Sequence, residues 1–99
     1  MKAVIIVATA ILFSKPAKAA NLNNGLKLYQ KCIECHGQNG EGDKSQKAPR
    51  IGGQYSWYII SQLNAFKSGE RKNPVMLPFV KALSASDIED LGAYVESIK

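Results

Sequence analysis

Two cysteines and a histidine lie within five consecutive residues, Cys32-Ile33-Glu34-Cys35-His36, and the 99-residue chain has no other cysteine or histidine. Two residues between the thiols place both on one turn of a helix, with the imidazole next on the same turn. Thiols at this spacing can each add to one vinyl group of a haem, and the following histidine can bind the iron through Nε2. The motif therefore predicts one covalently attached haem c per chain, anchored by Cys32 and Cys35, with His36 as a ligand of the iron.

Other chemistries of paired cysteines fit the rest of the sequence less well. A redox dithiol of the thioredoxin kind belongs in a βαβ unit, and the sequence has no strand pattern. Structural zinc needs four protein ligands, whereas the motif offers three and no second cysteine pair exists. A plain disulfide suits an oxidising compartment, but it would leave two glycine-rich loops without a surface to cover. Covalent haem is the interpretation that uses all three residues.

The first 19 residues have the layout of a secretory signal peptide. A positively charged start is followed by a mainly apolar run over residues 3–13, and Ala17-Lys18-Ala19 supplies an A-x-A cleavage pattern. The alternative is an uncleaved anchor, but the run is well short of the roughly 20 residues that span a bilayer. We predict cleavage after Ala19 or Ala20, export to the periplasm, a mature domain of residues 20–99, and no stable membrane insertion after cleavage.

Charge gives little support for a nucleic-acid partner once the leader is removed. The whole chain has a net charge of +5, from 13 basic and 8 acidic residues. Lys2, Lys15 and Lys18 lie in the leader, so 10 basic residues remain against the same 8 acidic ones, a net charge of +2. The remaining lysines are scattered, without a run of five like charges. We therefore expect no nucleic-acid partner.

The mature domain, about 80 residues, is small for an independent hydrophobic core. Glycine and proline mark residues 37–54 and 69–78 as irregular. Loops of this length are uncommon in a small domain unless they surround something. A haem would supply both an apolar interior and a surface for these loops.

Apolar spacing predicts an all-α fold with three main helices plus a short turn. The first helix has apolar residues at intervals of four, three and four: Leu22, Leu26, Tyr29 and Ile33. We expect Asn23 or Asn24 to cap its start and Gly37 to end it.

The other two helices follow the irregular segments. The second is predicted over residues 55–67, with Gly69 as its stop and an apolar stripe made of Tyr55, Tyr58, Ile59, Leu63 and Phe66. The short turn is expected over residues 79–83. The last helix is expected to begin near Ser84 or Ser86, with Ser86 and Glu89 in the spacing of a capping box. Its apolar stripe consists of Ile88, Leu91, Val95 and Ile98.

Counting possible ligands limits the sixth coordination position of the iron. His36 is the only histidine, so two histidines of one chain cannot both bind it. After removal of Met1 the only methionine is Met76, between Pro74 and Pro78, which fix φ and lack an N–H. A thioether ligand would raise the reduction potential and close the iron to small molecules. Two alternatives stay open: Met76 as an ordinary core residue, and an open sixth position suited to gas binding or peroxidase chemistry.

A set of further motifs follows the haem motif in a defined order along the mature chain. The set consists of Cys32 to Gly37, Gly40-Glu41-Gly42, Pro49 to Gln54, Tyr58, Gln62-Leu63, Phe66, Gly69-Glu70-Arg71, Met76, Leu83-Ser84, Asp87-Ile88 and Ala93-Tyr94. It resembles the class I c-type cytochromes, and among them the small soluble bacterial monohaem type similar to cytochrome c-553. The resemblance covers nearly the whole mature chain and implies the small cytochrome c fold, wrapped around one covalently bound haem.

The resemblance also implies roles for individual residues. His36 would be the proximal ligand and Met76 the distal one. The Pro49 carbonyl would accept a hydrogen bond from the His36 ring, which fixes its tautomer. The candidates for contact with the haem propionates are Gln54, Trp57 and Arg71. Alternative roles are a surface position for Trp57 and a solvated side chain for Arg71.

Two more expectations come from the same resemblance. Gly25 and Tyr29 would meet Tyr94 where the terminal helices cross. Members of the family often carry Leu-Ala-Gly-Gln where this chain has Ile51-Gly52-Gly53-Gln54, and the extra glycine is expected to loosen the loop.

The function implied by the resemblance is electron transfer, not catalysis. The leading hypothesis is a monomeric periplasmic electron carrier that keeps both axial ligands while its iron cycles between two oxidation states, and that meets redox protein partners by transient docking. The alternative is a haem-bearing electron-transfer subunit of a larger periplasmic oxidoreductase complex, because such subunits share the fold. A third hypothesis, an enzyme or sensor with an open iron site, is separated from these by Met76.

Overall fold

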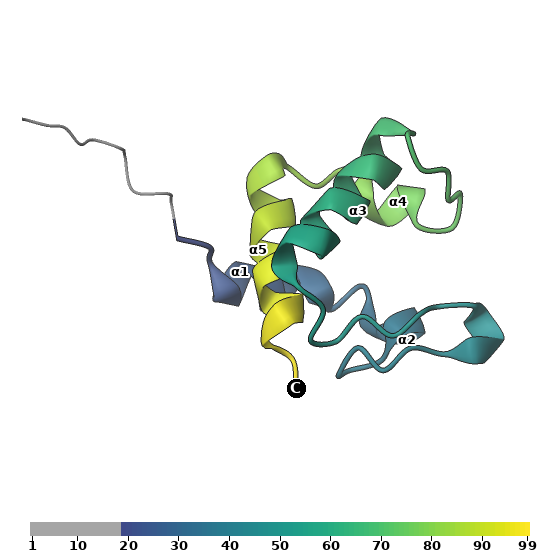
Figure 1. Ribbon diagram of the computed structural model, residues 1–99, viewed down its shortest axis with the longest axis horizontal. Helices are drawn as coiled ribbons and strands as arrows, with labels where there is room; N and C mark the ends of the chain where they lie inside the picture. Colours follow the sequence, from purple (N-terminus) through teal and green to yellow (C-terminus); the bar gives the residue numbers. More distant parts are fainter. Residues whose placement is uncertain (1–18) are drawn as a thin grey trace, which may run out of the picture.

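A computed structural model describes residues 19–99, and the predicted leader, except Ala19, lies outside the described residues. The elements are α1 (Leu22–Tyr29), α2 (Ile33–His36), the 3₁₀ turn η1 (Lys44–Gln46), α3 (Ser56–Ser68), α4 (Leu77–Val80) and α5 (Ala85–Ser97). Over residues 19–99 the only β-type pairing is an isolated bridge between Asp43 and Ala48. The all-α prediction is confirmed, with α1, α3 and α5 as the three main helices (Figure 1).

The first and last helices cross at a point where α1 has no side chain. A Cβ atom on Gly25 would lie 2.3 Å from the Asp90 carbonyl oxygen and 2.6 Å from Tyr94 Cβ. One turn later Tyr29 is fully buried, with its ring centroid 5.4 Å from that of Tyr94. The Tyr29 hydroxyl donates to the Gly37 carbonyl oxygen over 2.6 Å, which ties the crossing to the end of α2. The predicted meeting of Gly25 and Tyr29 with Tyr94 is confirmed.

The core lies where α3 and α4 pack with the crossed pair of terminal helices. Its buried members are Tyr29, Ile59, Leu63, Phe66, Val80, Ile88, Leu91, Val95 and Ile98. The whole predicted stripe of the last helix is therefore buried. In the second helix only the later part of the stripe is buried, because Tyr55 is 60% exposed and Tyr58 is 39% exposed. Gly92, which the sequence analysis did not single out, sets the approach of α3, since its Cβ would lie 2.8 Å from Ile60 Cγ1.

The first helix differs from its prediction in its cap and its continuity. Asn21 is the N-cap, and its side chain accepts the Asn24 backbone N–H at 3.0 Å. The helix stops at Tyr29 and resumes at Ile33, so Gly37, with φ of 88°, ends α2. Only part of the predicted apolar stripe is buried: Tyr29 is fully buried against α5, whereas Leu22 and Leu26 are 51% and 44% exposed.

The last helix has its N-cap at Ser84, one of its two predicted starts, whereas the short turn before it begins earlier than the sequence indicated. At α5 the capping box is Ser84 with Asp87, not Ser86 with Glu89. At α4 the turn is Leu77–Val80 instead of residues 79–83, with Pro78 in its first turn, where the missing N–H has no intrahelical partner to lose. The predicted stop of the second helix is confirmed: Gly69, with φ of 85°, is the C-cap of α3.

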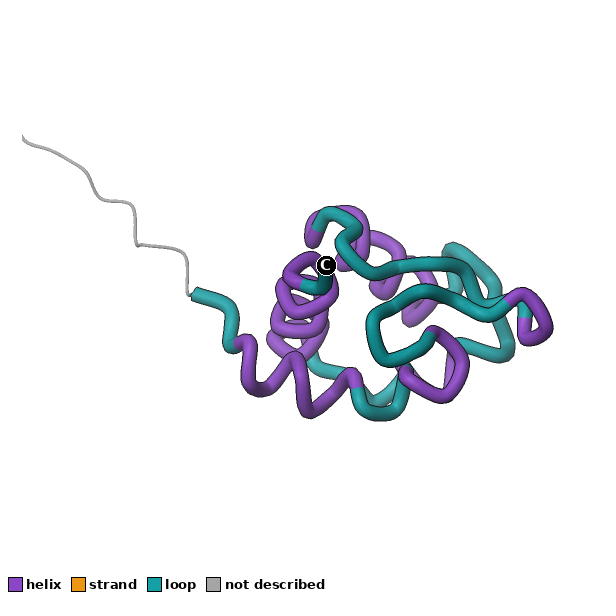
Figure 2. The backbone as a smooth tube through the Cα atoms, turned by 90° about the horizontal axis from the view of Figure 1, so that it is seen from below, coloured by secondary structure: helices purple, strands orange, loops and turns teal. Residues whose placement is uncertain are grey.

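The loop over residues 37–54 closes tightly on itself. The Gly40 carbonyl accepts the N–H groups of Ile51 at 2.8 Å and Gly52 at 3.0 Å. A Cβ atom on Gly52 would lie 2.2 Å from the Asn39 carbonyl oxygen. The expectation that Gly52 loosens the loop is therefore wrong, because the missing side chain lets the two backbones touch. Figure 2 shows this loop on the side of the molecule away from the start of α1.

Candidate haem-binding site

Cys32 is the N-cap residue of α2, and Cys35 and His36 lie on the single turn of this helix. The Cys32 carbonyl accepts the N–H of Cys35 at 3.3 Å and that of His36 at 2.8 Å, so the spacing that the sequence predicted is realised as helix. Both cysteines are free thiols at intermediate exposure. Burial, and then the charge of neighbouring Cys35, raises the pKa of the Cys32 thiol to about 11. Before haem attachment the Cys32 thiol is therefore protonated at neutral pH.

The His36 ring is buried and held in one orientation. It is 6% exposed, and its Nδ1 lies 2.9 Å from the Pro49 carbonyl oxygen. A carbonyl oxygen can only accept, so Nδ1 carries the proton and Nε2 keeps its lone pair. Among residues 19–99 Nε2 has no hydrogen-bond partner, although the buried side-chain nitrogens and oxygens of this part are all paired. Nε2 is therefore not fully enclosed by protein atoms, and its lone pair is available to bind a metal.

Gln46 is a contact of this turn that the sequence analysis missed. Its Nε2 donates to the Glu34 carbonyl oxygen at 3.2 Å, and its Oε1 lies 3.1 Å from Cys35 Sγ. These contacts tie η1 to α2 across the loop. No pattern in the sequence points to Gln46, because the contact depends on how the loop folds back.

Met76 lies immediately before α4, partly buried against the core. Its N–H and that of Val75 both donate to Asn73 Oδ1 at 3.1 Å, so Asn73 holds the turn that presents the thioether. The Asn73-Pro74 pair is a turn signal that could have identified this residue from the sequence. Figure 1 shows α2 and α4 on the same side of α5.

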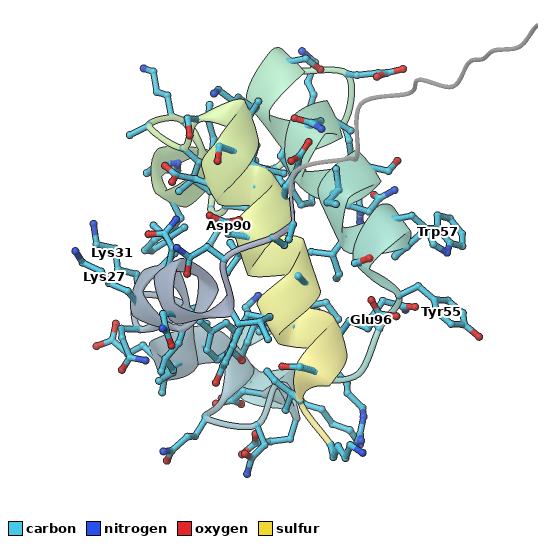
Figure 3. All side chains as sticks on the ribbon, turned by 90° about the vertical axis from the view of Figure 1, so that its left-hand side faces the viewer. Lys27, Lys31, Tyr55, Trp57, Asp90 and Glu96 are labelled. Carbon is cyan, nitrogen blue, oxygen red and sulfur yellow. The ribbon has the colours of Figure 1, made fainter. Side chains whose placement is uncertain are left out.

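The candidates for the haem propionates do not gather at one place. Trp57 is 66% exposed and stacks on Tyr55 with centroids 6.0 Å apart, and both rings point away from the helices in Figure 3. Arg71 follows the other end of α3, hydrogen-bonded to the Gln62 side chain and with its guanidinium 4.7 Å from the centroid of the Phe66 ring. The Gln54 side chain accepts a hydrogen bond from the backbone N–H of the next residue, Tyr55, at 3.0 Å. This placement favours the surface role for Trp57.

The residues present fit a covalent haem. Two thiols and an imidazole with an unshared Nε2 lone pair project from one turn, which is the donor set that such a group needs. Large apolar side chains for its ring are also exposed: Tyr58 of α3 at 39%, and Leu77 and Phe79 of α4 at 37% and 43%. Among residues 19–99 no group of three or more His, Cys, Asp and Glu side chains is arranged to hold a bare metal ion.

Comparison with known proteins identifies the family. A model of the cytochrome c family matches residues 22–99. The chain is 33% identical to cytochrome c-553 of Helicobacter pylori strain J99, over the full length of both proteins. The chain belongs to the cytochrome c family, as a small class I c-type cytochrome. Its cofactor is covalently bound haem c.

Longer proteins contain the same domain. The thiosulfate dehydrogenase electron acceptor of Stutzerimonas stutzeri is 34% identical over 90% of this chain and 44% of its own length. Cytochrome c4 of Pseudomonas stutzeri superposes with a TM-score of 0.73 at 30% identity, over 79% of this chain and 48% of that one. Thiosulfate dehydrogenase TsdBA of Marichromatium purpuratum gives 0.76 at 28% identity, over 80% of this chain and 19% of that one. The chain spans less than half the length of these three relatives.

Proposed function

We propose that this cytochrome is a periplasmic carrier of single electrons, with Cys32 and Cys35 as the haem anchors and His36 and Met76 as the axial ligands of its iron. The observation that carries the proposal is the buried His36 ring, fixed through Nδ1 by the Pro49 carbonyl and directly following the two thiols. A family match alone gives a haem protein; this geometry supports a specific proximal ligand.

The mechanism follows from how firmly the ligands are held. The haem supplies the iron that alternates between the ferric and ferrous states. Pro49 keeps the proton on Nδ1 and makes the ring a stronger donor at Nε2. Asn73 and the two flanking prolines hold the Met76 turn. Because neither ligand needs to move between oxidation states, little structural rearrangement opposes electron transfer.

The visible spectrum of the Met76→Ala variant tests the distal ligand. We expect the variant to lose the weak long-wavelength band of ferric iron bound to a thioether, to become high-spin and open to added ligands, and to have a lower reduction potential. The matched control is Val75→Ala, the neighbouring residue, which is 67% exposed and should leave the band intact. A ferric wild-type protein without this band would refute the His36/Met76 assignment.

Export and partners complete the proposal. Cleavage of the leader after Ala19 or Ala20 would release the domain into the periplasm as a monomer that docks transiently with redox proteins, without nucleic-acid partners. No helix over residues 19–99 is long and apolar enough to cross a membrane. Subcellular fractionation with mass measurement of the purified protein tests cleavage and location together. An intact leader in the purified protein would contradict this part.

A second candidate is an electron-transfer subunit of a larger oxidoreductase. It is favoured by the names of two relatives, the thiosulfate dehydrogenase electron acceptor and thiosulfate dehydrogenase TsdBA. Size-exclusion chromatography of the native protein separates the candidates. A free carrier elutes as a single domain, whereas a subunit elutes with a redox enzyme and leaves it only under denaturing conditions.

A further inference from the structure

A hollow of about 230 Å³ lies where the chain enters α1, against the first half of α5. Its lining residues are Ala19, Asn21, Asn24, Ser86, Glu89 and Asp90. Asp90 is 7% exposed and accepts two hydrogen bonds, from the Asn21 backbone N–H at 2.8 Å and from Asn24 Nδ2 at 2.9 Å. Both donors are neutral, so among residues 19–99 no positively charged group is hydrogen-bonded to this buried carboxylate. None of these residues belongs to the candidate haem site.

We infer that removal of the leader places the new α-ammonium group in this hollow, where it forms an ion pair with Asp90 and Glu89. The inference rests on the cleavage proposed above. Cleavage after Ala20 turns the nitrogen that already lies 2.8 Å from Asp90 Oδ1 into the ammonium group itself. Cleavage after Ala19 puts the charge on the preceding residue, whose Cα is about 3.8 Å from that of Asn21. Both sites leave the charge beside Asp90, in the hollow that Glu89 also lines.

Electrostatics makes carboxylates necessary at this position. An α-amino group is protonated at neutral pH, with an ordinary pKa of about 7.7 to 8.0. The dipole of a helix disfavours a positive charge near its N-terminus, and the new terminus lies at the start of α1. Asp90 and Glu89 of α5 reverse that local field, and the Asn24 amide links Asp87 to the same group at 3.1 Å. Hydrogen bonds between charged partners are also about twice as strong as neutral ones.

Cleavage of the leader would therefore hold the start of α1 against α5 through an ion pair. Before cleavage the Asn21 N–H is a neutral donor to Asp90; after cleavage a cation occupies the same place. In Figure 3 the segment that leads into α1 crosses α5 at the labelled Asp90, whereas Glu96 lies nearer the C-terminal end of α5. Glu96, exposed on the same helix, therefore provides a matched control.

Two forms of the haem-loaded protein test the inference. One is matured from the native leader, and the other carries a Gly-Ser insertion between Ala20 and Asn21, which moves the ammonium group two residues upstream at either cleavage site. Each is unfolded with guanidinium and followed by circular dichroism. In the wild type and in Glu96→Gln we expect the insertion to lower the folding equilibrium constant roughly tenfold. In Glu89→Gln and Asp90→Asn the same insertion should lower it by less than about threefold.

The outcomes separate this inference from the proposed carrier function. An equal effect of the insertion in all backgrounds, or no effect in the wild type, overturns the ion pair. If Asp90→Asn does not fold, the comparison of Glu89→Gln with Glu96→Gln decides, because both residues are exposed. A mature protein whose mass shows a first residue other than Ala20 or Asn21 also overturns it. The visible spectrum of that same protein reports on haem ligation independently of its terminus.

Discussion

Gly52 lies so close to the Asn39 backbone that alanine cannot replace it without movement. The new Cβ would be 2.2 Å from the Asn39 carbonyl oxygen, and a backbone oxygen cannot turn aside as a side chain can. We expect Gly52→Ala to destabilise the haem-loaded protein by about 1–3 kcal/mol, as overpacking does. Other family members often carry alanine at this position. A loss of stability in Gly52→Ala would mean that the Asn39 backbone of this chain occupies the space of that methyl group. Guanidinium unfolding of the two proteins measures the difference.

Gly69 provides a control, because its backbone conformation restricts the residue and no neighbouring atom does. Its φ is 85°, but nothing lies within 4 Å of an added Cβ. Gly69→Ala should therefore cost only the conformational penalty of about 1–2 kcal/mol and leave the haem spectrum unchanged. Gly52→Ala should also disturb the long-wavelength band, because Gly52 shares the 37–54 loop with Pro49. If Gly52→Ala kept the stability and the spectrum of the wild type, the close approach of Gly52 to the Asn39 backbone would not be what holds the loop.

At the scale of the helix, the start of α5 is fixed by one of two serines. The Ser84 side chain accepts the Asp87 N–H at 3.0 Å, and Asp87 Oδ2 accepts the Ser84 N–H at 3.2 Å. Ser84→Ala should lower the free energy of unfolding by about 1 kcal/mol, the usual cost of losing an N-cap. Ser86→Ala, at the exposed position that the sequence favoured, should change it little. Thermal or denaturant unfolding distinguishes the two, and a larger loss in Ser86→Ala would contradict the observed cap.

The helix boundaries show what apolar spacing and capping rules can predict. They indicated the residues of α3 and α5 to within about two positions and the stop at Gly69, because burial and left-handed glycine are local signals. They misplaced the cap of α1 because the Asn24 amide is used by two carboxylates of α5, which leaves the cap to Asn21. Such a choice depends on a partner more than 60 residues away in the chain, and no local pattern contains it.

The candidate site was predictable to a similar degree. The spacing of Cys32, Cys35 and His36 follows directly from one helical turn, so the motif alone indicated their placement. The contacts that Gln46 makes arise from the folding of a long loop and have no sequence signature. Trp57 was one of several plausible propionate contacts, and its exposed position depends on which face of α3 packs against the core.

The capping box also predicts how stability responds to acid. Hydrogen bonds from the Ser84 backbone N–H and then from the Asn24 side chain hold the pKa of the Asp87 carboxyl below its ordinary value. A pKa that is lower in the folded state gives stability above the unfolded value, and this is lost as pH falls through the folded value. We therefore expect stability to decrease below about pH 4, and less steeply in Asp87→Asn. Denaturant midpoints measured across this range test it; identical slopes would refute the contribution.

At the scale of the whole molecule, the helices form only part of an enclosed interior. α1 and α3 pack on α5, and α4 packs on α3, whereas residues 37–54 contain only a short 3₁₀ turn and one bridge. Apolar side chains of α3 and α4, including Tyr58, Leu77 and Phe79, are left partly exposed. A domain of this size has little apolar burial to spare. We therefore expect the covalent haem of this family to fill the interior and to be required for the stability of the folded domain.

Removing the anchors tests this dependence on haem. The double variant Cys32→Ser with Cys35→Ser keeps every helix signal and the residues of the core, and changes only the two sulfurs. If the haem completes the interior, this variant should accumulate little folded protein, because the helices alone cannot offset the ordering of the two long loops. Far-ultraviolet circular dichroism and hydrogen exchange of the haem-free product measure this. A compact, cooperatively unfolding helical domain without haem would mean that the α1, α3 and α5 core is sufficient by itself and that the loops form independently of the cofactor.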